Sequence, residues 1–247
     1  MSYEYSENEL VQNSAIELLR DTLGWRTFYA YNDEVLGNDS SSKSLGRSSY
    51  KEILLTRYLK EAVFKFNDWV TDEIFEQIVK ILNTKVSSDS DIQNNEKNYQ
   101  YFKDGIEVDV KDENGNYIKR RAKLFDFTHP EENDFLAVQE MKIWGEVYHR
   151  RADIVGFVNG IPLLFVELKR DDVDIQEAYE NNYKDYRTTI PQLFYYNAFI
   201  VFANGPEAKI GTLESKYKFF HEWKRLSEKD SGSVAFETLL LGVCNKK

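Results

Sequence analysis

The stretch of the sequence that could carry chemistry is RADIVGFVNGIPLLFVELKR, residues 151–170. It holds two apolar segments joined by an Asn-Gly pair, with the charged residues Asp153, Glu167 and Lys169 toward its far ends. Two carboxylates held a few ångströms apart repel each other unless a cation lies between them. Mg²⁺ prefers one or two carboxylates with water and phosphate oxygens, and a nearby ammonium group can stabilise charge that develops on a phosphate. These residue types together could perform metal-assisted phosphodiester hydrolysis.

The register of the two segments decides whether these side chains can meet. On a strand, Glu167 and Lys169 share a face because they are two residues apart. A two-residue turn at Asn159-Gly160 would place Asp153 opposite Val166, so that Glu167 would point to the other side of the sheet. An odd-length loop or one β-bulge would instead place Asp153 and Glu167 on the same face. The chemical hypothesis therefore requires such a loop or bulge.

A purely structural role is the alternative for these residues. Glu-x-Lys is common on strands, and Asp153 could pair with Arg151 or cap a turn. The position of Glu167 and Lys169 favours the chemical hypothesis, because the apolar run 162–166 ends abruptly at Glu167. An apolar run that ends in charged residues is the pattern expected of a buried central strand with polar groups at its end.

The elements expected before residue 99 are mainly helical. The sequence shows a helical stripe of apolar residues closed by a glycine and two further amphipathic segments. It also shows a Ser-rich loop and a polar linker without periodicity. In chain order they are a helix over Glu7–Trp25, a loop over Asn38–Ser49, helices over Tyr50–Phe66 and Thr71–Leu82, and an exposed linker over Asn83–Asn98.

From residue 99 onward the sequence favours strands. Two alternating segments around the turn Glu113–Asn116 predict a hairpin. Further along, the expected elements are a strand over Phe135–Gly145, the pair of strands in 151–170, a helix over Val173–Tyr186, a helical turn over Pro191–Tyr195, a strand over Asn197–Gly205, a short edge strand over Ala208–Leu213 and a helix over Val234–Lys247. This order suggests one α/β domain built around a mixed sheet.

Composition limits the function classes. The formal net charge of -10 argues against an autonomous nucleic-acid binder, because phosphate binding uses clustered Lys and Arg. One cysteine, Cys244, excludes an internal disulfide and fits a reducing cytoplasm. No secretory signal and no apolar run near the ~20 residues of a membrane span occur, so we expect a cytoplasmic protein without a membrane partner. The absence of Gly-x-x-x-x-Gly-Lys-Ser/Thr indicates that this chain does not bind ATP itself.

The long motif around the charged residues resembles a known family. Arg-x-Asp-Ile-Val-x-Phe-Val-Asn-Gly-Ile-Pro-Leu-x-x-x-Glu-Leu-Lys is similar to the nuclease core in the motor (R) subunit of type I restriction enzymes, which belongs to the PD-(D/E)xK superfamily. The segment Ile190–Leu213 and the sequence HEWKR at His221–Arg225 are similar to the same family. The resemblance covers nearly the whole chain and is sharpest over 151–225. It implies a restriction-endonuclease-like α/β fold, a mixed central sheet flanked by helices.

The resemblance also implies roles for individual residues. Asp153 and Glu167 become metal ligands, with the carbonyl of Leu168 as a third, and Lys169 becomes the catalytic lysine. Together with Asp153 and Glu167 it would cleave DNA with Mg²⁺, for which Mn²⁺ should substitute. No other cofactor is implied for this chain.

Two elements of the family pattern leave alternatives open. The family has a Gln-x-x-x-Tyr element on the helix after the lysine; here the expected spacing falls on Asn182 and Tyr186, whereas Gln192 and Tyr196 fit the letters but come later. Relatives often place a glutamate on the first helix, where the nearest matching position here is Gln12. Whether Glu9 or Glu17 substitutes for it stays open.

The family places this domain before a helicase-like motor in one long polypeptide. We therefore expect residues 1–247 to form a single endonuclease domain, with a helical part at about 1–98, a catalytic sheet core at about 99–225 and a final helix leading to a motor domain outside this chain. ATP would bind only that motor. The implied partners are double-stranded DNA and the methyltransferase and specificity subunits of a type I restriction complex.

Two other functions compete with this expectation. The first is a non-catalytic module of the same fold that docks DNA or another subunit, which the amides at Gln12 and Asn182 favour. The second is a stand-alone nuclease that acts on ends or branched nucleic acids. Loss of metal binding would point to the first, and unassisted cleavage to the second.

Overall fold

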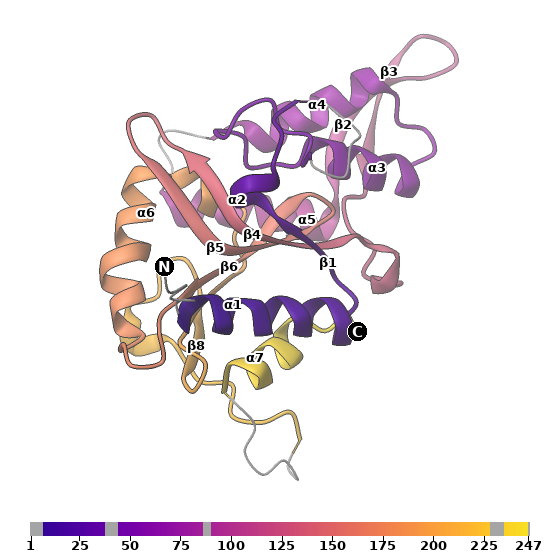
Figure 1. Cartoon of the computed structure of the whole chain (residues 1–247). Coiled ribbons are helices and arrows are strands. Elements are labelled where there is room, and N and C mark those ends of the chain that lie inside the picture. The colour runs from indigo at the N-terminus through magenta and orange to yellow at the C-terminus, as the bar shows by residue number, and fades with distance from the viewer. Residues whose placement is uncertain (1–6, 38–43, 86–89, 228–234, 247) are drawn as a thin grey trace.

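The computed structural model describes residues 7–37, 44–85, 90–227 and 235–246. Within these ranges, a mixed sheet of six strands in the order β1-β4-β5-β6-β7-β8 forms the centre of the molecule (Figure 1). Its strands are β1 (Arg26–Tyr29), β4 (Phe135–Trp144), β5 (His149–Val158), β6 (Ile161–Leu168), β7 (Phe199–Ala203) and β8 (Ala208–Gly211). The pairs β1–β4 and β6–β7 are parallel, and the other neighbours are antiparallel. A separate antiparallel hairpin is made by β2 (Ile106–Lys111) and β3 (Tyr117–Ala122).

Helices surround this sheet. The α-helices are α1 (Glu7–Glu17), α2 (Ala30–Asp33), α3 (Thr56–Phe66), α4 (Asp72–Asn83), α5 (Asp91–Asp104), α6 (Lys184–Thr189) and α7 (Ala235–Val243). Two π-helical turns, η1 (Leu18–Thr22) and η3 (Ala178–Tyr183), continue α1 and precede α6, and three 3₁₀ turns are η2 (Pro130–Glu132), η4 (Pro191–Phe194) and η5 (Tyr217–Phe219). Among the described ranges, no helix combines the length and apolar character needed to cross a bilayer.

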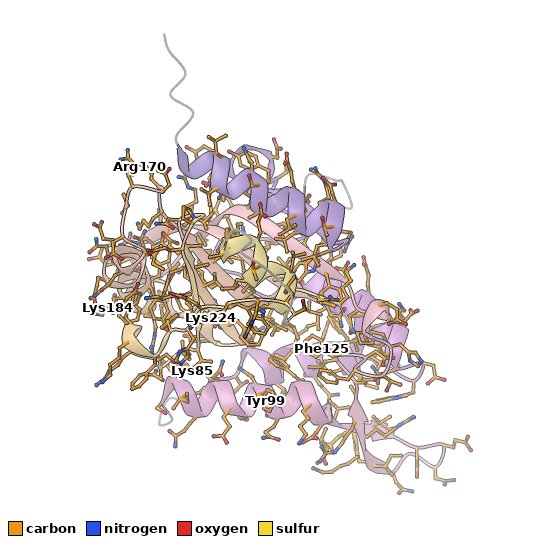
Figure 2. The ribbon with its side chains drawn as sticks, turned by 90° about the horizontal axis from the view of Figure 1, so that it is seen from below. Lys85, Tyr99, Phe125, Arg170, Lys184 and Lys224 are labelled. Carbon is orange, nitrogen blue, oxygen red and sulfur yellow. The ribbon has the colours of Figure 1, made fainter. Side chains whose placement is uncertain are left out.

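The two faces of the sheet are covered by different helices. Leu19 of η1 and Leu239 of α7 pack on one face, and α1 and α7 lie side by side there (Figure 1). Tyr183 and Tyr186 pack on the other face. A third apolar cluster joins α3 and α4 to the β2–β3 hairpin. The view in Figure 2 shows Tyr99 of α5 on the opposite side of the sheet from α1. The predicted α/β architecture, a mixed central sheet flanked by helices, is thus confirmed.

Several predicted elements are confirmed at their positions. The β2–β3 hairpin, the strands β4 to β8 and the turn η4 all occur at the predicted segments, with β5 beginning two residues earlier than predicted, at His149. Helix α4 begins where predicted, because the hydroxyl of Thr71 accepts a hydrogen bond from the amide of Ile74 at 3.4 Å and so caps the helix. The predicted final helix corresponds to α7.

The prediction of an exposed linker over Asn83–Asn98 is wrong from residue 91 onward, where helix α5 begins. Ser90 and Gln93 form a capping box at its start. The helix buries asparagines rather than leucines, and the amide of Asn98 donates to the carbonyl of Tyr195 at 2.9 Å. Because hydrogen bonds take the place of an apolar stripe, hydrophobic periodicity does not reveal this helix.

Two further predictions need correction. The helix expected over Tyr50–Phe66 begins only at Thr56, because the chain before it forms a turn and the amide of Leu55 bonds to the carbonyl of Gly160 at 2.9 Å. The helix expected over Val173–Tyr186 starts later and passes through the π-helical turn η3. Strand β1 was not predicted. Residues 38–43 of the expected loop lie outside the described residues.

The turn between β5 and β6 packs tightly against helix α3. Both of its residues have positive φ, 50° at Asn159 and 77° at Gly160. A Cβ atom added at Gly160 would lie 2.4 Å from the carbonyl oxygen of Leu55. Contacts under 3 Å with backbone are not relieved by side-chain movement, so only glycine fits here.

We predict that Gly160→Ala lowers the free energy of unfolding by roughly 2–5 kcal/mol, because it adds a backbone clash to the strain of a left-handed conformation. The matched control is Gly115→Ala, at a turn with φ of 80° and nothing within 4 Å of the added Cβ. The control should lose only about 1 kcal/mol. Urea unfolding of both variants makes the comparison, and equal losses would show that the packing at Gly160 does not matter.

Candidate active site

The junction between β5 and β6 contains the bulge that the chemistry requires. The turn pairs Val158 with Ile161, as a two-residue hairpin does. The register then shifts by one residue, since Phe157 pairs with Pro162 whereas Ile154 pairs with Val166. The extra residue on β6 brings the next residue of β5, Asp153, opposite Glu167.

The carboxylate of Asp153 forms a hydrogen bond to β6 just beyond the last backbone pair of β5 and β6. Its Oδ2 atom accepts a hydrogen bond of 2.7 Å from the backbone amide of Leu168. Burial raises the pKa of Asp153 to about 6, and the negative charge of Glu140 adds to the rise, while the bond from Leu168 opposes it. The pKa of Asp153 thus lies close to neutrality, as is common for carboxyl groups at functional sites.

The carboxylate of Glu167 is the least satisfied group of the site. Its residue is only 3% exposed, and its Oε2 atom is buried without a hydrogen-bond partner. Burial, followed by the charge of Asp153, raises the pKa of Glu167 well above its usual value, and the charge of Lys169 opposes this rise. A buried carboxylate oxygen that lacks a donor is suited to bind a cation.

The ammonium group of Lys169 is fixed by the helix that follows the strand. Its Nζ atom donates a hydrogen bond of 2.6 Å to Oδ1 of Asn182 in η3. The hydroxyl of Tyr186 donates to the backbone carbonyl of Arg151, two residues before Asp153, at 2.9 Å. Figure 2 shows Arg170, the residue after Lys169, at the end of the sheet near the start of α1.

The alternative pair, Gln192 and Tyr196, points elsewhere. The side-chain amide of Gln192 bonds to the carbonyl of Trp144, and the hydroxyl of Tyr196 bonds to the carbonyl of Leu82. The structure therefore places Asn182 against Lys169 and Tyr186 against the backbone of β5 at Arg151, and it directs the other pair elsewhere. Their catalytic roles stay predictions.

The first helix reaches the site through Gln12. Its side chain is buried, and Nε2 donates to the carbonyl of Asp153 at 2.9 Å and to Oε1 of Glu140 at 3.0 Å. Of the two possible substitutes for a first-helix acid, Glu17 is exposed, and the side chain of Glu9 lies outside the described part of the structure. An amide therefore occupies the position on α1 that contacts the site.

Glu140 is a third carboxylate that sequence reasoning missed. It lies on β4 between Gln139, which pairs with Ile154, and Met141, which pairs with Ala152. Its φ is 58°, and its Oε2 atom lies 2.5 Å from Nε of Arg151. The signal in the sequence was the adjacent polar pair Gln139-Glu140, which interrupts the alternation expected along this strand.

The three carboxylates do not close around a common point. In the described part of the chain, no group of three or more His, Cys, Asp or Glu side chains could hold a metal ion. Glu140 is directed to Gln12 and Arg151 instead. A cation between Asp153 and Glu167 would therefore have two carboxylate ligands, which leaves its other positions to carbonyl oxygens and water.

We predict that Glu167→Gln stabilises the chain in the absence of metal at pH 7 by ~1–2 kcal/mol, as removal of a strained active-site group often does. Since the folded-state pKa of Glu167 is raised, the folded state binds more protons than the unfolded state above the ordinary glutamate pKa, and stability falls as pH rises through this window. The gain should vanish at pH values below that ordinary pKa.

Thermal unfolding at several pH values measures this effect. The control is Glu222→Gln, at an exposed glutamate, which should change stability by less than about 0.5 kcal/mol. A lower melting temperature for Glu167→Gln at pH 7 would contradict the prediction.

Comparison with known proteins assigns the chain to a family. A family model described as "Type I restriction enzyme R protein N terminus" matches residues 4–219. The HindI type I restriction enzyme endonuclease subunit of Haemophilus influenzae is 29% identical over 97% of this chain and 22% of its own length. A putative MjaIXP type I restriction enzyme endonuclease subunit of Methanocaldococcus jannaschii is 28% identical over 93% of this chain and 21% of its own length.

The chain thus spans about a fifth of the length of these relatives. The match of the family model covers most of the sequence, including all the site residues described above. This chain belongs to the family of type I restriction enzyme R protein N-terminal regions.

Proposed function

We propose that this chain is the Mg²⁺-dependent DNA endonuclease domain of a type I restriction–modification R subunit. It would hydrolyse phosphodiester bonds after ATP-driven translocation by domains outside this chain. The observation that carries the proposal is the convergence of Asp153, Glu167 and Lys169 at the point where the pairing of β5 with β6 ends. Family membership supports it, because the similar proteins are named endonuclease subunits of type I restriction enzymes.

The donor atoms fit a hard divalent cation. Asp153 and the unpartnered oxygen of Glu167 are the two carboxylate ligands, and we assign the carbonyl of Leu168 as a third. The raised pKa values of both carboxyl groups fit the same interpretation, since a bound cation would favour their charged forms. When bound, Mg²⁺ would supply positive charge against the oxygens of the phosphodiester group.

The remaining residues would orient the reaction. The ammonium group of Lys169, held by Asn182, is placed to position the attacking water or to stabilise charge that develops on the phosphate. The hydroxyl of Tyr186 donates a hydrogen bond to the carbonyl of Arg151 and so fixes the helical segment that carries Asn182 against β5, close to Asp153. Asn182 and Tyr186 are therefore positioning residues, and Lys169 is the catalytic one.

The setting that the proposal implies is a cytoplasmic restriction complex. The partners would be double-stranded DNA, a specificity subunit that reads the sequence and a methyltransferase subunit. The R subunit's motor would bind ATP. An amide at Gln12 in place of an acid is the observation that favours the alternative, a non-catalytic docking module, and the metal titration below separates the two.

We predict that the unchanged chain binds Mn²⁺ and Mg²⁺ and that Asp153→Asn and Glu167→Gln each weaken this binding at least about tenfold, because each removes one charged ligand. Titration calorimetry measures it on variants that unfold at temperatures no lower than the unchanged chain. Glu222→Gln is the control with the same loss of charge. Equal affinities in all four proteins, or no binding in any, would favour the non-catalytic module.

We predict that Lys169→Met leaves Mn²⁺ binding intact but lowers the rate of DNA cleavage at least about 100-fold, because the group that orients water is lost. The assay uses a full-length R subunit carrying the substitution, assembled with its partner subunits, ATP and plasmid DNA. Lys216→Met, at an exposed lysine, serves as the control. Cleavage by Lys169→Met at the unchanged rate would remove Lys169 from the mechanism.

A further inference from the structure

Two cations face each other across the strands next to the carboxylates. Lys142 of β4 and Arg151 of β5 are direct partners in the antiparallel ladder. Like charges directly opposite each other destabilise a sheet. Both side chains are at least partly exposed, and Arg151 lies two residues before Asp153. The ion pair between Arg151 and Glu140 offsets part of this repulsion, and an anion that binds between the two cations would offset the rest.

The two cations share one aromatic ring. The guanidinium carbon of Arg151 lies 4.6 Å from the ring centroid of Tyr31 in α2, and the ammonium of Lys142 lies 5.1 Å from the same centroid. Cation–π contacts of this kind hold a charged group in place without neutralising it. The ring therefore orients both charges and leaves them able to attract an anion.

The partners of Arg151 fix its orientation. Its Nε atom pairs with Glu140, which Gln12 holds from the other side. A planar guanidinium has further donors beyond Nε, and it suits the geometry of phosphate oxygens. In the described part of the chain, no carboxylate lies within ion-pair distance of the Lys142 ammonium. By contrast, the neighbouring Arg150 is engaged by Asp185.

Cationic side chains lie next to the carboxylates on this part of the sheet. The charges of Arg151 and Lys169 both lower the pKa of Glu167 and oppose its rise. Lys142 is the ladder partner of Arg151, which pairs with Glu140. A divalent cation bound by Asp153 and Glu167 would add positive charge to this surface. Phosphates of a DNA strand are the anions that a nuclease surface of this kind would receive.

We propose that Lys142 and Arg151, held by Tyr31, form a phosphate-binding subsite that anchors the DNA backbone beside the carboxylates. This inference rests on the proposed nuclease function and adds residues that bind the substrate. Contacts of this kind position a strand without reading its sequence. The subsite would thus set which phosphodiester bond reaches Asp153 and Glu167.

The test is the salt dependence of DNA binding by the 247-residue chain. Fluorescence anisotropy with a short labelled duplex in Ca²⁺, a dication with oxygen ligands, gives the dissociation constant at several salt concentrations. For Lys142→Gln/Arg151→Gln we expect at least about tenfold weaker binding and a slope of log K against log salt that is shallower by about 2, because two phosphate contacts are lost.

The matched control is Lys111→Gln/Arg120→Gln on the β2–β3 hairpin. These residues also rest on aromatic rings, Lys111 on Tyr117 and Arg120 on Trp69 at 5.5 and 4.2 Å, and the pair removes the same net charge. The control should retain the affinity and the slope of the unchanged chain. Equal losses of DNA affinity and of salt slope in both double variants would show that only the net charge of the chain matters, and they would overturn the subsite.

A Mn²⁺ titration of the same proteins separates this inference from the proposed function. Metal binding by Lys142→Gln/Arg151→Gln should match the unchanged chain within about twofold, since no ligand is removed. Normal metal binding with an unchanged salt slope would overturn the subsite alone and leave the nuclease assignment standing. An unchanged chain that binds no DNA even at low salt would overturn the subsite as well, whereas failure of the nuclease assignment would appear as absent metal binding.

Discussion

The hydrogen bond from the Leu168 amide to the Asp153 carboxylate stands where a backbone bond between β5 and β6 would otherwise continue the ladder. It forms because one extra residue in β6 shifts the register before the strands reach their ends. With the other register, the carboxylates of Asp153 and Glu167 would lie on opposite faces of the sheet. The tight packing of Gly160 against the start of α3 fixes the turn between β5 and β6, and the position of this turn sets the register of the two strands.

Electrostatic strain accompanies this arrangement. Burial raises the pKa of both carboxyl groups. The charge of Asp153 further raises the pKa of Glu167, and the charge of Glu140 raises the pKa of both. The cations Lys169 and Arg151 offset part of this repulsion without contacting the unpartnered oxygen of Glu167. This group of buried, mutually repelling charges therefore lowers the stability that the fold could otherwise have.

The sequence predicted the parts of the site that follow from strand alternation and from the long motif. The apolar run that ends at Glu167 predicted a buried strand with a polar tip, and the need for a bulge followed from the spacing of Asp153 and Glu167. The interrupted alternation at Gln139-Glu140 was not enough to place Glu140 in the site. Its position depends on which strand pairs with β5 and on a positive φ that its residue type does not predict. Helix α5 escaped prediction for a different reason, since buried asparagines such as Asn98 replace the apolar stripe.

The backbone of Glu140 has a consequence for protein engineering. A φ of 58° is unstrained for glycine, strains asparagine slightly and strains other residues more. Selection for stability alone would therefore be expected to replace this glutamate, as it would the buried Glu167. A library of variants screened only for heat resistance would then accumulate substitutions at these positions. The positions substituted most often in the selected variants would identify residues that the chain keeps for a purpose other than folding.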